Sequence, residues 1–199
     1  MKTLFLGDSY TIGESVDQTE GWPLQLVTEL RLRGFPMAEP VIIAQTGWTT
    51  GDLIKAIKCQ EIETGFDLVS LLIGVNNQFQ NRDLEEYHFQ FHQLMEKAIY
   101  LADNQPFRVM VLSIPDWGVT PFAEGRVRLR ITEEIDRFNQ INRQEAECGE
   151  VHYIDVTTIS RQASNDPSLI AEDGLHPSSK MYQVWVKTIL PEVLEILEN

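Results

Sequence analysis

Short apolar segments alternate along the chain with longer segments in which apolar residues recur every three to four positions. The short segments are rich in leucine and β-branched residues, and their near-continuous hydrophobicity is typical of strands that are covered on both faces. We expect five strands, at Thr3–Leu6, Val41–Ala44, Leu68–Ile73, Val109–Ile114 and Val151–Asp155. Strands that alternate with helical segments predict repeated βα units around a parallel sheet, and therefore an α/β fold.

The longer segments have the periodicity of amphipathic helices. They are Trp22–Arg33, Thr50–Ile62, Asp83–Ala102, about Ile131–Glu147 and a last helix from about Ser179. Pro191 lies inside the last segment, and it has no N–H to give to the preceding turn. We therefore expect Pro191 to kink or interrupt that helix.

The length of 199 residues predicts one domain, residues 1–199. The formal charge of −14 argues against nucleic acid or an anionic membrane surface as the main partner, because either would repel the protein. No apolar run approaches the length of a membrane span, and the first residues lack the pattern of a signal peptide. We expect a cytoplasmic protein, unless a leader precedes the sequence as given.

The cysteines and histidines give little sign of a metal site. Cys59 and Cys148 lie far apart without a CxxC pair, so buried or idle thiols are expected rather than a disulfide framework. His88 and His92 have the spacing of metal ligands on a helix, but the glutamate of a zinc-peptidase helix is missing between them. We predict no metal and no cofactor.

A serine follows the first strand at once, in Gly7-Asp8-Ser9-Tyr10. Ligands of open α/β sheets bind outside the carboxyl ends of the strands, where a sharp turn lifts a hydroxyl out of the sheet. We interpret Ser9 as a candidate nucleophile, which needs a base to take its proton. The alternative is a turn serine that caps the following segment.

The segment Asp173-Gly174-Leu175-His176-Pro177 precedes the last helix and offers that base. Its spacing lets the Asp173 carboxylate reach Nδ1 of His176, which leaves Nε2 free to face a serine. In such a triad the histidine takes the serine proton, and the aspartate fixes the tautomer of the imidazole. Ser9, Asp173 and His176 are therefore the predicted catalytic residues. Capping of the last helix by Asp173 and His176 is compatible with this role.

Acyl transfer also needs hydrogen-bond donors aimed at the developing oxyanion. Gly47 follows the second predicted strand, and Asn76 follows the third. Glycine lets a backbone N–H approach closely, and an asparagine amide is a neutral donor. Together with the N–H of Ser9, these groups form the predicted oxyanion hole; ordinary loop chemistry is the alternative for Gly47 and Asn76.

Aromatic residues lie just past the ends of predicted strands, where a substrate would enter. They would line an acyl pocket or stack on a sugar face, or else pack the loops. The predicted substrate-binding residues are the aromatic Trp48, Trp117 and Phe122, together with the polar Asn77, which follows the third predicted strand. Arg126, with Arg128 and Arg130, is expected to be solvated or salt-bridged, with contact to an anionic substrate group as the alternative.

These segments, in this order, resemble the four blocks of the GDSL, or SGNH, hydrolase family, which is named for its Ser, Gly, Asn and His. The resemblance covers positions 7 to 177 and rests on Gly7-Asp8-Ser9, Gly47, Gly74-Val75-Asn76 and Asp173-Gly174-Leu175-His176. It implies a flavodoxin-like, three-layer αβα sandwich and hydrolysis of esters or thioesters. Ser9 would be the nucleophile, with Gly47 and Asn76 as further oxyanion donors.

The chain departs from the family pattern at two positions. Tyr10 stands where leucine is commoner, and we expect this to change local packing only. Asn77 stands where aspartate is commoner, so a neutral amide replaces a carboxylate that would support further hydrogen bonds.

The sequence predicts a metal-independent serine esterase that acts through an acyl-enzyme. Its small-molecule substrate would be an O-acetylated sugar, a short-chain lipid ester or a thioester. One alternative is an acyltransferase that uses the same triad. Another is a non-catalytic domain that binds a carbohydrate or an anion at the first strand-to-helix turn, although that turn lacks a Walker lysine and a dinucleotide fingerprint. No oligomeric state is predicted.

Overall fold

The computed structural model describes residues 1–198 and contains one five-stranded sheet with the order β2-β1-β3-β4-β5. Every neighbouring pair of strands is parallel. The strands are β1 (Thr3–Gly7), β2 (Val41–Ala44), β3 (Leu68–Leu72), β4 (Val109–Leu112) and β5 (His152–Ile154). The predicted α/β fold is confirmed, and each strand begins within one residue of its expected start.

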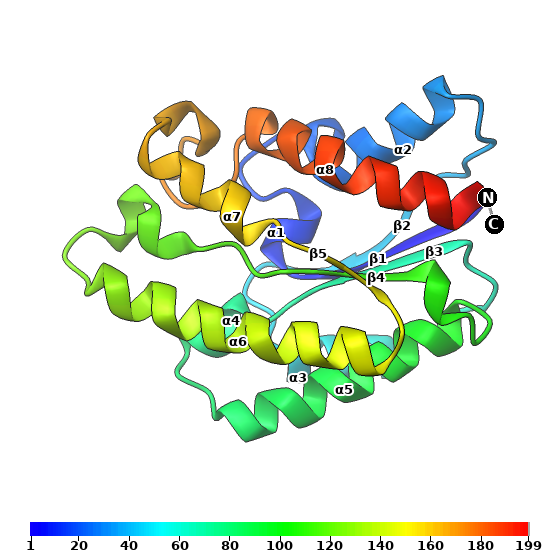
Figure 1. Ribbon diagram of the computed structural model, residues 1–199, viewed down its shortest axis with the longest axis horizontal. Helices are drawn as coiled ribbons and strands as arrows, with labels where there is room; N and C mark the ends of the chain where they lie inside the picture. The colour runs from blue at the N-terminus through cyan, green and yellow to red at the C-terminus, as the bar shows by residue number, and fades with distance from the viewer. Residues whose placement is uncertain (199) are drawn as a thin grey trace.

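Long helices cover both faces of this sheet, so the molecule has three layers (Figure 1). On one face, α2 (Trp22–Leu32) packs against α8 (Ser179–Glu198). The other face carries α3 (Thr50–Lys58), α5 (Leu84–Leu101) and α6 (Arg128–Cys148). This arrangement is the predicted αβα sandwich.

The burial of each strand depends on its place in the sheet. All residues of β1, β3 and β4 are buried, whereas the edge strand β2 is partly exposed. Strands that are covered on both faces need apolar side chains on both, which is the pattern in the sequence. The largest fully buried side chains include Trp22 in α2 and Trp185 in α8.

Helix α3 is shorter than expected. Helix α3 begins as predicted, with a capping box between Thr49 and Asp52, but it ends at Lys58 rather than at Ile62. The chain turns back there, so that the N–H groups of Gly65 and Phe66 bond the Leu101 carbonyl at the end of α5.

Helix α8 continues through Pro191, so of the predicted kink or interruption, the interruption does not occur. The missing hydrogen bond of a proline is tolerated because the neighbouring turns are anchored in the core. Ile189 and Val193 are both fully buried on either side of Pro191.

The short elements that lie between the strands and the long helices were not predicted. They are α1 (Ser9–Ile12), α4 (Val75–Phe79) and α7 (Thr157–Ser160), with 3-10 turns at Gln18–Glu20, Pro106–Arg108, Trp117–Val119, Pro121–Ala123, Arg161–Ser164 and Pro167–Leu169. A helix of one turn is too short to show a hydrophobic period. Helices α1 and α4 nevertheless carry the polar residues on which the site depends.

Cys59 and Cys148 are free and exposed, so neither is a buried core thiol. His88 and His92 both contact Glu145 of α6, at 2.5 Å and 2.7 Å, a partner that the sequence did not indicate. Within residues 1–198, no group of side chains has the arrangement of a metal site. No helix in the same part of the chain is both long and apolar enough to cross a membrane.

Candidate active site

Ser9 lies at a sharp turn between β1 and α1. Asp8 caps α1, because its Oδ1 accepts a hydrogen bond from the N–H of Tyr10 at 3.1 Å. The turn is so tight that a Cβ at Gly7 would lie 2.5 Å from the Leu72 carbonyl oxygen. A glycine is therefore required at position 7, two residues before the serine. The turn places Ser9 at the carboxyl end of the sheet.

Ser9, His176 and Asp173 form a continuous hydrogen-bonded chain. His176 Nε2 lies 3.0 Å from Ser9 Oγ, across 167 positions of sequence. His176 Nδ1 lies 2.5 Å from Asp173 Oδ2. The structure thus brings together the three residues that the sequence predicted, in the geometry that a general base and its orienting carboxylate require.

Asp173 is held by several donors at once. Its Oδ1 accepts hydrogen bonds from the N–H groups of Leu175 and His176, at 2.9 Å and 3.0 Å. Its Oδ2 accepts a further bond from Ser15 Oγ at 2.8 Å. Burial alone would raise the pKa of Asp173, but the bonds from His176, Leu175 and Ser15 lower it to about 2. The carboxylate therefore stays ionised beside the imidazole at neutral pH.

Three potential donors border the same end of the pocket as Ser9 Oγ. Ser9 is the first residue of α1, so its N–H has no acceptor within that helix. Gly47 follows β2 with a φ of +84°, a conformation that glycine adopts without strain. Asn76, on α4, donates one amide hydrogen to the Trp48 carbonyl at 2.9 Å, which fixes the amide and leaves the other hydrogen available.

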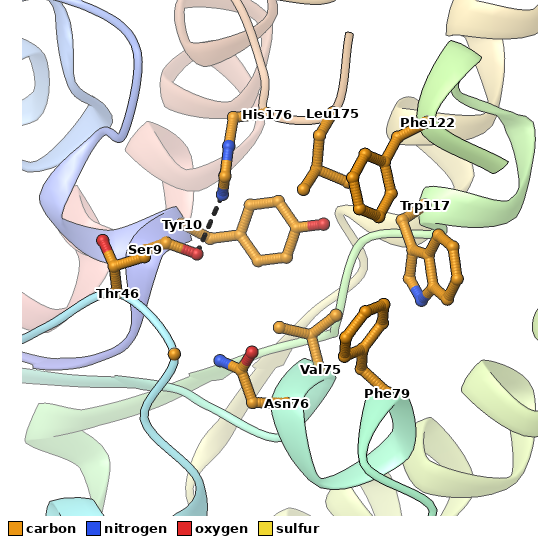
Figure 2. Close-up of a pocket in the computed structure, with 11 residues that line it drawn as sticks. Ser9, Tyr10, Thr46, Val75, Asn76, Phe79, Trp117, Phe122, Leu175 and His176 are labelled. Atoms are coloured by element: carbon orange, nitrogen blue, oxygen red, sulfur yellow. Dashed lines mark hydrogen bonds between the residues drawn. The ribbon is translucent and has the colours of Figure 1, made fainter. Parts of the chain in front are cut away.

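A cavity of about 190 Å³ extends from the triad. Figure 2 shows Ser9, Thr46, Asn76 and His176 at one end, and Phe79, Trp117 and Phe122 at the other. The remaining lining residues are Tyr10, Gly47, Val75 and Leu175. The cavity is therefore polar where the triad lies and apolar along the rest of its length.

The apolar end is a cluster of three aromatic rings. The ring centres of Phe79, Trp117 and Phe122 are 5.5 to 6.3 Å apart. The Arg126 guanidinium lies 5.2 to 5.4 Å from all three centres, without bordering the cavity itself. A guanidinium over aromatic faces is attracted by their quadrupoles, so Arg126 holds this cluster together from outside.

Tyr10 differs from what the sequence indicated. Its side chain does more than pack locally, because the phenol lines the cavity and its ring lies edge-on to His176, with ring centres 5.6 Å apart. Burial, and then the nearby carboxylates of Asp8, Asp116 and Asp173, raise the pKa of Tyr10 well above its ordinary value. The phenol is therefore uncharged at neutral pH.

Two predicted substrate-binding residues do not line the cavity. Asn77 is buried behind it: Oδ1 accepts the N–H of Thr50 at 3.0 Å, and Nδ2 donates to Thr50 Oγ1 at 2.7 Å. Its role is to tie α4 to the start of α3. The Trp48 side chain packs against the core, and only its carbonyl takes part in the site. Trp117 and Phe122 do line the cavity, as predicted.

Several residues in and around the site were missed. Val75 stands beside the predicted oxyanion donor Asn76, and Leu175 stands beside the predicted base His176, so the signal was their adjacency to the motifs. Ser15 carried no signal, because its contact with Asp173 joins positions 158 residues apart.

A serine, a histidine and a carboxylate in contact at the carboxyl end of a parallel sheet form the arrangement of a serine hydrolase site. The sequence matches the GDSL-like lipase/acylhydrolase family over residues 5–184. The chain belongs to this family, whose members are enzymes that act on ester bonds, so the predicted family and enzyme class are confirmed.

Solved structures share the fold at low sequence identity. The chain is 18% identical to TesA, with a TM-score of 0.77 and 99% and 100% of the two chains covered. It is 20% identical to Axe2, an acetylxylan esterase from Geobacillus stearothermophilus, with a TM-score of 0.76 and 96% and 93% covered. It is 16% identical to the esterase EstA from Pseudoalteromonas sp., with a TM-score of 0.75 and 100% and 99% covered. A search of curated protein sequences found no match.

Proposed function

We propose that this protein hydrolyses a carboxylic ester through an acyl-enzyme formed on Ser9. The observation that carries the proposal is the unbroken path from Ser9 Oγ through His176 to Asp173, with contacts of 3.0 Å and 2.5 Å. A serine is a weak nucleophile until an adjacent base removes its proton, and this contact supplies the base.

The reaction proceeds in two halves. His176 Nε2 takes the proton of Ser9 Oγ as the oxygen attacks the ester carbonyl, and then protonates the departing alkoxide. Water next attacks the acyl-enzyme, with His176 again acting as base, and releases the acid and free Ser9. Asp173 stabilises the imidazolium that forms in each half.

The oxyanion of each tetrahedral intermediate is stabilised by the N–H groups of Ser9 and Gly47 and by the Asn76 amide. The Trp48 carbonyl holds that amide in place before the substrate binds, so no reorganisation is needed during the reaction.

The cavity favours an ester with an acyl group larger than acetyl. Past the triad, its walls are chiefly aromatic and aliphatic, and its volume is about 190 Å³. A cavity of about 150 Å³ is sufficient to hold a benzene molecule. We propose a short- to medium-chain acyl ester or thioester as the substrate class, in preference to an O-acetylated sugar.

A comparison of two serine variants tests the assignment. Ser9→Ala should abolish the turnover of p-nitrophenyl hexanoate, whereas Ser164→Ala, in an exposed turn outside the cavity, should leave it unchanged. Full activity of a folded Ser9→Ala variant would refute the proposal. Product analysis with added alcohols then distinguishes hydrolysis from acyl transfer.

A further inference from the structure

The hydroxyl group of Tyr10 has no hydrogen-bond partner within the part of the chain that the structure describes. The residue is 2% exposed, and Figure 2 shows its hydroxyl directed along the cavity, away from Ser9 and toward Trp117. The oxygen therefore faces the space that a bound acyl group would occupy.

The other buried or half-buried tyrosines of this chain satisfy their hydroxyl groups. Tyr87 donates to the Ile73 carbonyl at 3.2 Å, Tyr153 to the Asn139 carbonyl and Tyr182 to the Tyr10 carbonyl, both at 3.3 Å. Buried polar groups in folded proteins are nearly always paired. Among the buried and half-buried tyrosines of residues 1–198, Tyr10 alone lacks such a bond, and its hydroxyl points into the candidate active site.

The remainder of the apolar end offers a substrate no other donor. Phe79, Phe122, Val75 and Leu175 have apolar side chains, and the Trp117 indole N–H already donates to Gln78 Oε1 at 2.8 Å. A polar atom on a bound acyl group would therefore meet the Tyr10 hydroxyl and nothing else.

The phenol is also held in one place. It extends from the tight turn that positions Ser9, the Tyr182 hydroxyl bonds its backbone carbonyl, and its ring packs against His176. A donor fixed relative to the nucleophile selects substrates by the distance between their reacting carbonyl and their second polar atom.

We propose that Tyr10 determines specificity by donating a hydrogen bond to an oxygen atom on the acyl chain, so that the preferred substrates are esters of oxygenated acyl groups. Keto, hydroxy and alkoxy acyl chains present such an oxygen, and a plain alkyl chain does not. This inference rests on the proposed function, because it describes the acyl group that Ser9 would receive.

The preference between acyl chains depends on whether the chain gives the Tyr10 hydroxyl a hydrogen-bond partner. An alkyl chain that fills the cavity leaves the hydroxyl buried without a partner, which disfavours its binding relative to an oxygenated chain. One neutral hydrogen bond corresponds to a preference of roughly threefold to tenfold in kcat/KM.

The test compares p-nitrophenyl hexanoate with a set of p-nitrophenyl oxohexanoates whose keto oxygen stands at successive carbons. The wild type should prefer at least one oxohexanoate by roughly threefold to tenfold, and Tyr10→Phe should bring that ratio close to unity. The ratio is measured on one enzyme sample, so partial loss of folded protein does not affect it. Tyr153→Phe, which removes a hydroxyl outside the cavity, should keep the wild-type ratio.

Equal ratios in the wild type and Tyr10→Phe would overturn the inference and leave the proposed function standing. Absence of Ser9-dependent hydrolysis of every ester in the set would instead refute the proposed function, and the inference with it.

Discussion

Ser15 Oγ donates a hydrogen bond of 2.8 Å to Asp173 Oδ2, the same oxygen that contacts His176 Nδ1. Ser15 has a φ of +66°, which is uncommon for a residue with a Cβ. The preceding residue, Glu14, accepts a hydrogen bond from Thr46, next to Gly47. One short segment after α1 thus contacts both Asp173 and the loop that carries Gly47, a donor of the proposed oxyanion hole.

We predict that Ser15→Ala lowers kcat roughly threefold to tenfold while KM stays the same. The reason is that Asp173 loses a donor that fixes the oxygen facing the imidazole. Steady-state kinetics with p-nitrophenyl hexanoate measure both constants. Ser15→Gly is the control for the backbone, because glycine adopts this φ freely and also lacks the hydroxyl. Wild-type kcat in both variants would show that the bond has no role in positioning.

The adjacent residues Asn76 and Asn77 should respond differently to the same change. Asn76→Ala removes an oxyanion donor, so we expect kcat to fall by about 10²–10³. Asn77→Ala leaves the buried N–H of Thr50 without a partner and removes the bond that the Thr50 hydroxyl accepts, so we expect the free energy of unfolding to fall by about 1–3 kcal/mol. Kinetics and urea denaturation of the two variants separate the effects. A large loss of kcat in a fully folded Asn77→Ala variant would contradict this division.

Asp8 should make the protein less stable as the pH rises. Burial raises the pKa of this carboxyl group to about 7, despite opposing hydrogen bonds from the backbone of Tyr10 and Gly74. The unfolded chain has the ordinary value of 3.8, so the contribution of Asp8 to stability is full below that pH and is lost as the pH rises to about 7.

The variant Asp8→Asn removes this titration. Relative to the wild type, its free energy of unfolding should increase between about pH 4 and pH 8, by at most about 4 kcal/mol. Urea denaturation at both pH values measures the difference, and any fixed effect of the amide cancels between them. A difference that does not change with pH would mean that Asp8 is ionised throughout the range.

Phe122 closes the apolar end of the cavity and should limit the length of the acyl chain. Phe122→Ala removes a ring from the cluster beneath Arg126, so the optimum in a series of p-nitrophenyl esters should shift to longer chains. Phe89→Ala, at an exposed position of α5, is the matched control and should keep the wild-type optimum. An unchanged optimum in Phe122→Ala would place the acyl group elsewhere.

The sequence predicts the sheet well, because strands covered on both faces need apolar residues at every position. Leu68–Leu72 illustrates this: all five residues are buried, and the run was recognisable without the structure. Ser9, Asp173 and His176 were predicted for a different reason, since each stands next to a strand or helix end in a short motif.

Side-chain direction was harder to predict. Asn76 and Asn77 are neighbours with the same amide, yet the one-turn helix α4 directs one to the cavity and the other to Thr50. Tyr10 likewise enters the cavity because α1 begins at Ser9, and a helix of four residues leaves no periodic pattern in the sequence. Contacts between distant positions, such as Ser15 with Asp173, depend on the assembled fold.

The most direct test of the account is to locate the residue that a fluorophosphonate modifies. The reagent forms a covalent bond with an activated serine, and peptide mass spectrometry identifies the site. We predict a single adduct on Ser9 in the wild type, and its loss in His176→Ala, because that variant lacks the base 3.0 Å from Ser9 Oγ. An adduct on another residue, or undiminished labelling of Ser9 in His176→Ala, would contradict the account.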